Sequence, residues 1–196
     1  GALRINVIAM RSWLLRISCV AVVASVAVGL GALNTAGSAK QSGIVAGTSH
    51  VAVIAESLGE SGVPVRTLIP GGMCPGHFDM RPSDVEAVRT CRALILQPFQ
   101  PQMGNVQGLV RAAELPDERI KVAHVEGGWM PPQIQAQAVE AIGRLLGELE
   151  PERAAVYRER AEHRAKAVRD YGRALRARFD EAGVRDVPVL CNTHIA

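Results

Sequence analysis

Residues 70–88 read P-G-G-M-C-P-G-H-F-D-M-R-P-S-D-V-E-A-V. This loop follows an apolar run, residues 63–69, that predicts a β-strand. Ser83 and Glu86 match the capping-box pattern S-x-x-E, which predicts a helix beginning at Asp84. Loops at the carboxyl ends of parallel strands are where open α/β sheets bind ligands. We therefore expect a ligand site in this Gly- and Pro-rich loop.

Strand and helix patterns alternate outward from this loop. Short apolar runs predict strands at residues 43–47, 63–69, 93–96 and 120–125. The segments between them predict helices at residues 51–58, 84–90 and 106–113. This alternation predicts the α/β class, with a parallel four-stranded sheet flanked by helices and right-handed crossovers. The expected amino-terminal lobe spans residues 40–132.

Helical patterns dominate residues 133–184. An apolar residue recurs every three or four positions from Ile134 to Leu149, which predicts an amphipathic helix. Pro151 suits the first turn of the next helix, which continues to Ala182 without another Pro. A helix of about thirty residues is roughly 45 Å long, and we expect it to join two lobes. Residues 185–196 then begin a second, incomplete lobe with a strand at residues 187–190.

Residues 1–39 have the features of a secretory signal peptide with some residues upstream. Met10, Arg11 and Arg16 precede an uncharged apolar run, residues 17–33, and small residues follow it as far as Ala39. This order is typical of a signal that is cleaved on export. A transmembrane anchor is the alternative, but the small-residue end favours cleavage after Ala39. We expect a periplasmic or extracellular protein.

Charge and cysteine content limit the partners. The formal net charge of +3 arises from 22 basic and 19 acidic residues that are dispersed along the chain, which argues against nucleic acid. Cys19 would leave with the signal, so that Cys74, Cys91 and Cys191 remain. An odd number of cysteines in an oxidising compartment implies an unpaired thiol, or thiols that a metal holds.

From Gly43 to Ala196 the chain resembles the helical-backbone substrate-binding proteins of zinc and manganese ABC importers. The likeness rests on the first strand and helix, P-S-D-V at residues 82–85, Trp129 with Pro132, E-P-E at residues 150–152, and the long helix. The resemblance implies two lobes joined by that helix, a transition metal in the cleft, a membrane ABC permease as partner and no catalysis. We expect a monomer that is truncated after the backbone helix.

The metal-ligand motifs differ from the usual form of that family. Gly76 stands where the family has a His in its D-P-H motif, and Gly127 stands where it has the His of H-x-W-x-x-P. His194 matches the third family His, soon after the strand that follows the long helix. His124 and Glu126 are reserve ligands just upstream of Gly127.

Two C-x-x-H pairs supply the donors instead, Cys74 with His77 and Cys191 with His194. Each pair follows a predicted strand, so the pairs could face each other across a two-lobe cleft. Two thiolates and two imidazoles form a tetrahedral site suited to Zn²⁺. Thiolates would also admit copper, and the family resemblance adds manganese.

Several alternatives remain open from the sequence. Cys74 and Cys191 could form a disulfide, with Cys91 buried near the third strand. A Cys with a nearby His could act as nucleophile and base in a secreted enzyme. A degenerate family member that binds nothing is the third alternative, because a missing second lobe would expose apolar surface on the long helix.

Overall fold

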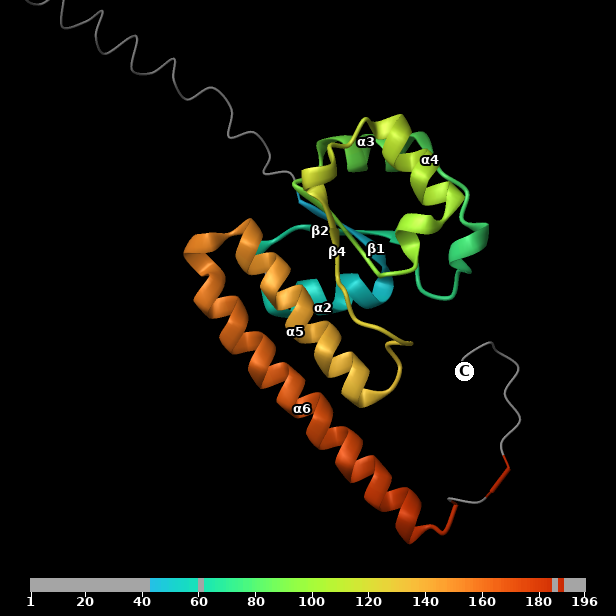
Figure 1. Cartoon of the computed structure of the whole chain (residues 1–196), viewed down its shortest axis with the longest axis vertical. Helices are drawn as coiled ribbons and strands as arrows, with labels where there is room; N and C mark the ends of the chain where they lie inside the picture. The colour runs from blue at the N-terminus through green and yellow to red at the C-terminus, as the bar shows by residue number, and fades with distance from the viewer. Residues whose placement is uncertain (1–42, 60–61, 185–186, 189–196) are drawn as a thin grey trace, which may run out of the picture. The chain divides into compact units, whose positions relative to one another are not determined.

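A four-stranded parallel sheet forms the centre of the protein (Figure 1). The structure, a computed structural model, describes residues 43–59, 62–184 and 187–188. The strands have the order β2-β1-β3-β4, and their bounds are β1 Ile44–Thr48, β2 Val65–Ile69, β3 Ala93–Leu96 and β4 Ile120–Val122. In register, Ile44 pairs with both Val65 and Ala93, and Leu94 pairs with Ile120. The predicted α/β class and parallel four-stranded sheet are confirmed.

Helices follow each strand as the alternation predicted. The α-helices of the described residues are α2 Ser49–Gly59, α3 Pro82–Thr90, α4 Gly104–Ala113, α5 Pro132–Leu149 and α6 Ala154–Glu181. Single 3₁₀ turns lie between them: η2 Pro75–His77, η3 Gln100–Gln102, η4 Asp117–Arg119 and η5 Pro151–Arg153. None of the helices in the described part of the chain is long and apolar enough to span a membrane.

Alternate side chains of the strands supply two hydrophobic cores, one on each face of the sheet. Ile44, Ala46 and Ile95 pack with α2, α5 and the amino half of α6. Val45 and Leu94, whose side chains point to the opposite face, pack with α3 and α4. Both sheet faces are therefore covered, which explains why the strands read as continuous apolar runs.

The start of α3 differs from the prediction. The helix begins at Pro82, two residues earlier than expected, and Ser83 lies inside its first turn. The Asp84 carboxylate, and not Ser83, accepts a hydrogen bond from the backbone N–H of Arg81 at 3.0 Å. Pro82 suits the first helical position because its φ angle is already helical and its missing N–H needs no partner. The predicted capping box of Ser83 and Glu86 is therefore wrong.

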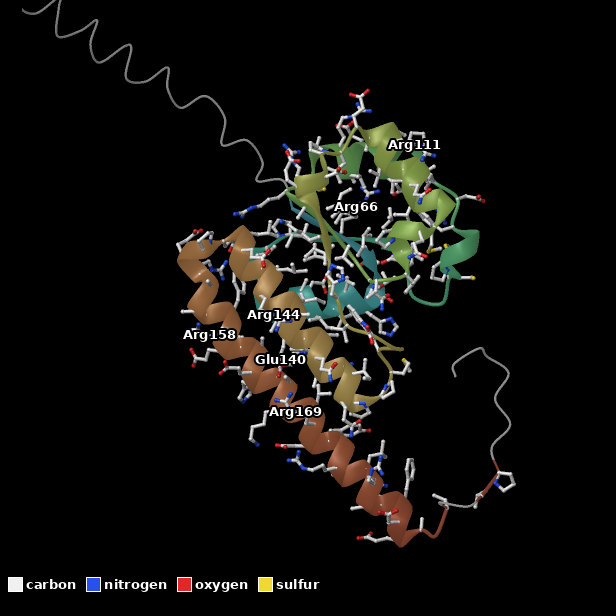
Figure 2. The ribbon with its side chains drawn as sticks, in the orientation of Figure 1. Arg66, Arg111, Glu140, Arg144, Arg158 and Arg169 are labelled. Atoms are coloured by element: carbon white, nitrogen blue, oxygen red, sulfur yellow. The ribbon has the colours of Figure 1, made fainter. Side chains whose placement is uncertain are left out.

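The two last helices form an antiparallel hairpin (Figure 1). They approach closely at Gly143, where an added Cβ would lie 2.6 Å from the Cβ of Ala161. Farther along, the Arg169 guanidinium donates to the Glu140 carboxylate at 2.8 Å, and Figure 2 labels both residues. The predicted long helix is confirmed at 28 residues. The proposed signal, residues 1–39, lies outside the described residues. Of the strand predicted at residues 187–190, residues 187–188 are described and form no strand, and residues 189–190 lie outside the described residues.

Candidate functional site

The loop after β2 carries Cys74 and His77 at the carboxyl edge of the sheet. Cys74 is exposed and immediately precedes the η2 turn. Phe78, just after that turn, is buried in the core against α3 and α4. The Asn105 side-chain amide of α4 donates to the backbone carbonyl oxygen of Pro75 at 2.8 Å. Asn105 therefore fixes the Cys74–His77 turn, a role for which its sequence position carried no signal.

The two described cysteines differ in reactivity. Cys91 is 3% exposed, and burial raises the pKa of its thiol to about 11, although the nearby Arg119 charge opposes this shift. A thiol must lose its proton to act as a metal ligand or nucleophile, so Cys91 is suited to neither role. Cys91 is thus buried beside β3, as in the disulfide alternative, but Cys191 of that alternative lies outside the described residues. Cys74 remains the accessible thiol of the described residues.

The loop after β4 places the reserve ligands at the surface. His124 and Glu126 are both exposed, and Gly127 has a positive φ of 86° that favours glycine. Trp129 is 4% exposed, and its indole N–H donates to the Val125 carbonyl oxygen at 3.5 Å. Trp129 therefore packs in the core with α2 and α5.

The described residues by themselves do not assemble a metal centre. Within residues 43–59, 62–184 and 187–188, no three His, Cys, Asp or Glu side chains are placed to hold an ion. The structure describes the backbone of His77 but not its side chain, and Cys191 and His194 lie outside the described residues. The four-ligand site of Cys74, His77, Cys191 and His194 thus stays a prediction.

A buried polar cluster occupies the carboxyl ends of β1 and β3, where the strand order reverses. The Thr48 hydroxyl donates to the Gln97 side-chain oxygen at 2.9 Å, and the Gln97 backbone N–H donates to the Gln100 side-chain oxygen at 2.9 Å. Gln100 is fully buried and lies against Gly47, where any side chain would collide with its amide. Open α/β sheets bind ligands at this switch point. The sequence positions of Thr48, Gln97 and Gln100 carried no signal for this cluster.

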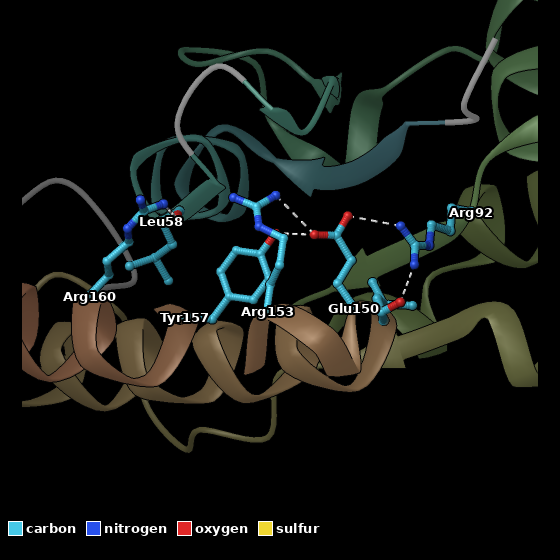
Figure 3. A network of polar contacts seen from close by, with 7 residues as sticks. Leu58, Arg92, Glu150, Arg153, Tyr157 and Arg160 are labelled. Atoms are coloured by element: carbon cyan, nitrogen blue, oxygen red, sulfur yellow. Dashed lines mark hydrogen bonds and ion pairs between the residues drawn. The ribbon is translucent and has the colours of Figure 1, made fainter. Parts of the chain in front are cut away.

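A second polar network lies at the opposite, amino edge of the sheet (Figure 3). Glu150, between α5 and η5, accepts hydrogen bonds from Arg92 at 2.9 Å, from Arg153 at 3.1 Å and from the Tyr157 hydroxyl. Arg92, which immediately precedes β3, also donates to the Leu149 carbonyl oxygen. The network therefore ties the turn between α5 and α6 to the sheet.

Electrostatics in this network favour the ionised carboxylate. Burial alone would raise the pKa of Glu150, but the Tyr157 hydrogen bond and the Arg92 and Arg153 charges lower it below its ordinary value. Burial and the hydrogen bond to Glu150 raise the pKa of the Tyr157 phenol to about 12. The Arg153 guanidinium also lies 5.0 Å from the Tyr157 ring centroid, a cation–π distance. This network positions the long helix.

Comparison of sequences identifies the class of protein. A sequence profile described as ZnuA, zinc-uptake complex component A periplasmic, matches residues 44–194. The chain belongs to this family, as the resemblance implied. No curated protein matches the chain significantly.

Solved structures share the fold at low sequence identity. Zn(II)-bound AdcA from Streptococcus pneumoniae is 16% identical with a TM-score of 0.56, and the match covers 67% of this chain and 31% of AdcA. A periplasmic metal binding protein from Candidatus Liberibacter asiaticus is 16% identical with a TM-score of 0.59, covering 70% and 56%. The metal-dependent lipoprotein YcdH from Bacillus subtilis is 14% identical with a TM-score of 0.55, covering 69% and 55%. The chain thus matches less than two thirds of the length of each.

Proposed function

We propose that this chain is the amino-terminal lobe and backbone helix of a secreted, non-catalytic binding protein that captures a transition metal for an ABC importer. The family match over residues 44–194 is the observation that carries this proposal. Solved structures of the same fold are described as bound to Zn(II), Mn or Cd. Zinc is the metal proposed first, because the sequence offers thiolates and imidazoles.

The proposed ligands are Cys74, His77, Cys191 and His194. Cys74 supports this set because its thiol is exposed in a loop that Asn105 and Phe78 hold in place. The family ligand positions Gly76 and Gly127 offer no donor side chain, which favours the two C-x-x-H pairs as the donors, with His124 and Glu126 in reserve. Ligands from both ends of the long helix would couple metal capture to the closing of a cleft.

Cobalt substitution tests both the metal and the thiolates. The reduced chain is titrated with Co²⁺ and then with Zn²⁺, and thiolate-to-cobalt charge-transfer absorption is measured. We expect one equivalent of bound metal and an intense thiolate band that Zn²⁺ abolishes. The Cys74→Ser and Cys191→Ser variants should each reduce this band, whereas Cys91→Ala should leave it unchanged.

Histidine variants distinguish the predicted ligands from the reserve ligands. His77→Gln and His194→Gln should weaken zinc binding at least tenfold by calorimetry. His163→Gln, at an exposed position on α6, is the matched control and should leave the affinity unchanged. Loss of affinity in His124→Gln or Glu126→Gln would replace the proposed set. A chain that takes up no metal from saturating zinc would reject the proposal.

A further inference from the structure

A small pocket lies at the carboxyl edge of the sheet, where α2 begins, and its Ser49 lies near Gly71 of the loop that carries Cys74. Its volume is about 270 Å³, and its wall includes Ser49 and His50 of α2, Trp129, Gln135 of α5 and Arg164 of α6. Pockets for drug-sized ligands measure about 300–1,000 Å³, so this pocket suits a smaller molecule. Three helices and the loop after β4 meet here, which makes the wall a product of the tertiary fold.

The charge of this pocket is unbalanced. Arg164 is partly buried, its Nε atom is buried without a hydrogen-bond partner, and no carboxylate in the described part of the chain pairs with it. None of the residues that line the pocket is acidic. By contrast, Arg66, Arg92, Arg153 and Arg169 each contact a carboxylate. A guanidinium stays protonated in proteins, so its partial burial without a counter-charge is unfavourable.

The other residues of the pocket wall indicate the chemistry of its ligand. Ser49, His50 and Gln135 offer hydroxyl, imidazole and amide donors, and a guanidinium binds a carboxylate through two parallel hydrogen bonds. Val53, Ile54 and Trp129 form an apolar side of the pocket. An anion with an apolar portion satisfies both sides, whereas inorganic phosphate would leave the apolar side bare.

We propose that this pocket binds a small organic carboxylate, with Arg164 as its counter-charge and Ser49 as a hydrogen-bond donor. None of the lining residues is one of the proposed metal ligands. Trp129 reports on occupancy, because a ligand in the pocket would contact its indole ring and change its fluorescence.

The full chain is titrated with acetate, isobutyrate, benzoate and inorganic phosphate while Trp129 fluorescence and heat are measured. The Trp13→Phe background removes the other tryptophan of the chain. Buffers are cleared of metal with a chelating resin, because soluble chelators are themselves carboxylates. We expect saturable binding of isobutyrate or benzoate that is at least tenfold tighter than binding of phosphate. Preference for phosphate, or no saturation by any carboxylate, would overturn the proposal.

Variants then test the assigned residues. Arg164→Gln should weaken carboxylate binding at least tenfold, and Ser49→Ala should weaken it severalfold. Arg158, which Figure 2 labels on α6, does not line this pocket, so Arg158→Gln removes the same charge and should change the affinity less than twofold. Circular dichroism confirms that each variant is folded. Equal affinities in wild type, Arg164→Gln and Ser49→Ala would reject this site.

Discussion

Burial and neighbouring charges determine how readily individual side chains of this protein ionise. Glu150 shows the effect of partners, because two guanidinium groups and a phenol hold its carboxylate in the ionised state. Cys91 shows the effect of burial, because the core around it disfavours the thiolate. Both effects can be measured one residue at a time.

Replacement of Glu150 by Gln should lower the free energy of unfolding by about 1–3 kcal/mol at neutral pH, because the negative charge and one of the two acceptor oxygens are lost. Denaturant unfolding measures this change. Tyr157→Phe removes only the hydroxyl and should cost less, about 1 kcal/mol. An unchanged stability in Glu150→Gln would mean that the network does not tie the hairpin to the sheet.

The same carboxylate should make stability depend on pH in the acid range. The pKa of Glu150 is lower in the folded protein than its ordinary value of 4.5, so its contribution is complete above that pH. The contribution is lost as the pH falls through the folded-state pKa. The stability difference between wild type and Glu150→Gln should therefore shrink below about pH 4.5. A difference that grows on acidification would contradict the assigned direction of the shift.

Alkylation should separate the two described thiols. In the reduced, metal-free chain at pH 8, a pKa of about 11 leaves roughly one Cys91 thiol in a thousand ionised. Iodoacetamide should therefore modify Cys74 and spare Cys91, as measured by mass spectrometry of peptides. Zinc should protect Cys74 if that thiol is a ligand. Rapid modification of Cys91 in the folded chain would contradict its burial.

At the scale of elements, the α5–α6 hairpin requires the two helix backbones to lie close together. The strands place alternate side chains on opposite faces of the sheet. Gly143 allows the two helices to touch where a side chain would separate them. The strand runs were recognisable from the sequence because both faces of each strand are apolar and buried. The start of α3 was not recognisable. Ser83 matches the usual N-cap pattern, but the observed N-cap is Arg81, whose backbone N–H donates to Asp84.

Gly143→Ala should destabilise the protein by about 1–3 kcal/mol, because the new Cβ would collide with Ala161 and force the helices apart. Gly108→Ala in α4 is the control, since its Cβ would lie at an ordinary 3.4 Å from Met80. The control should gain up to about 1 kcal/mol from helix propensity. Thermal and denaturant unfolding measure both variants, and a stabilised Gly143→Ala would show that the helices can separate freely.

Across the whole molecule, the long helix is only half covered by the described residues. Tyr157, Ala161 and Ala165 are buried, whereas Tyr171 is 66% and Phe179 is 53% exposed. The carboxyl half of α6 therefore carries apolar side chains that no core of the described residues covers. The second lobe that the family resemblance implied beyond this helix stays a prediction.

The two halves of α6 should respond differently to truncation of an aromatic side chain. Tyr157→Ala should cost about 3–5 kcal/mol because it opens a cavity in the core. Phe179→Ala should change the free energy of unfolding by less than about 0.5 kcal/mol, as expected at a surface position. Urea denaturation compares the two variants. A large loss in Phe179→Ala would place that residue in the same cooperative core.

Local patterns were enough to define the α/β class, the parallel sheet and the long helix, because hydrophobic periodicity and helix punctuation depend on residues close in sequence. The pocket around Arg164, the cluster of Thr48, Gln97 and Gln100, and the bond from Asn105 to the Cys74 loop had no such pattern. Each joins residues about thirty or more positions apart. Their meeting depends on the strand order and on how the helices pack, and no spacing along the chain encodes those distances.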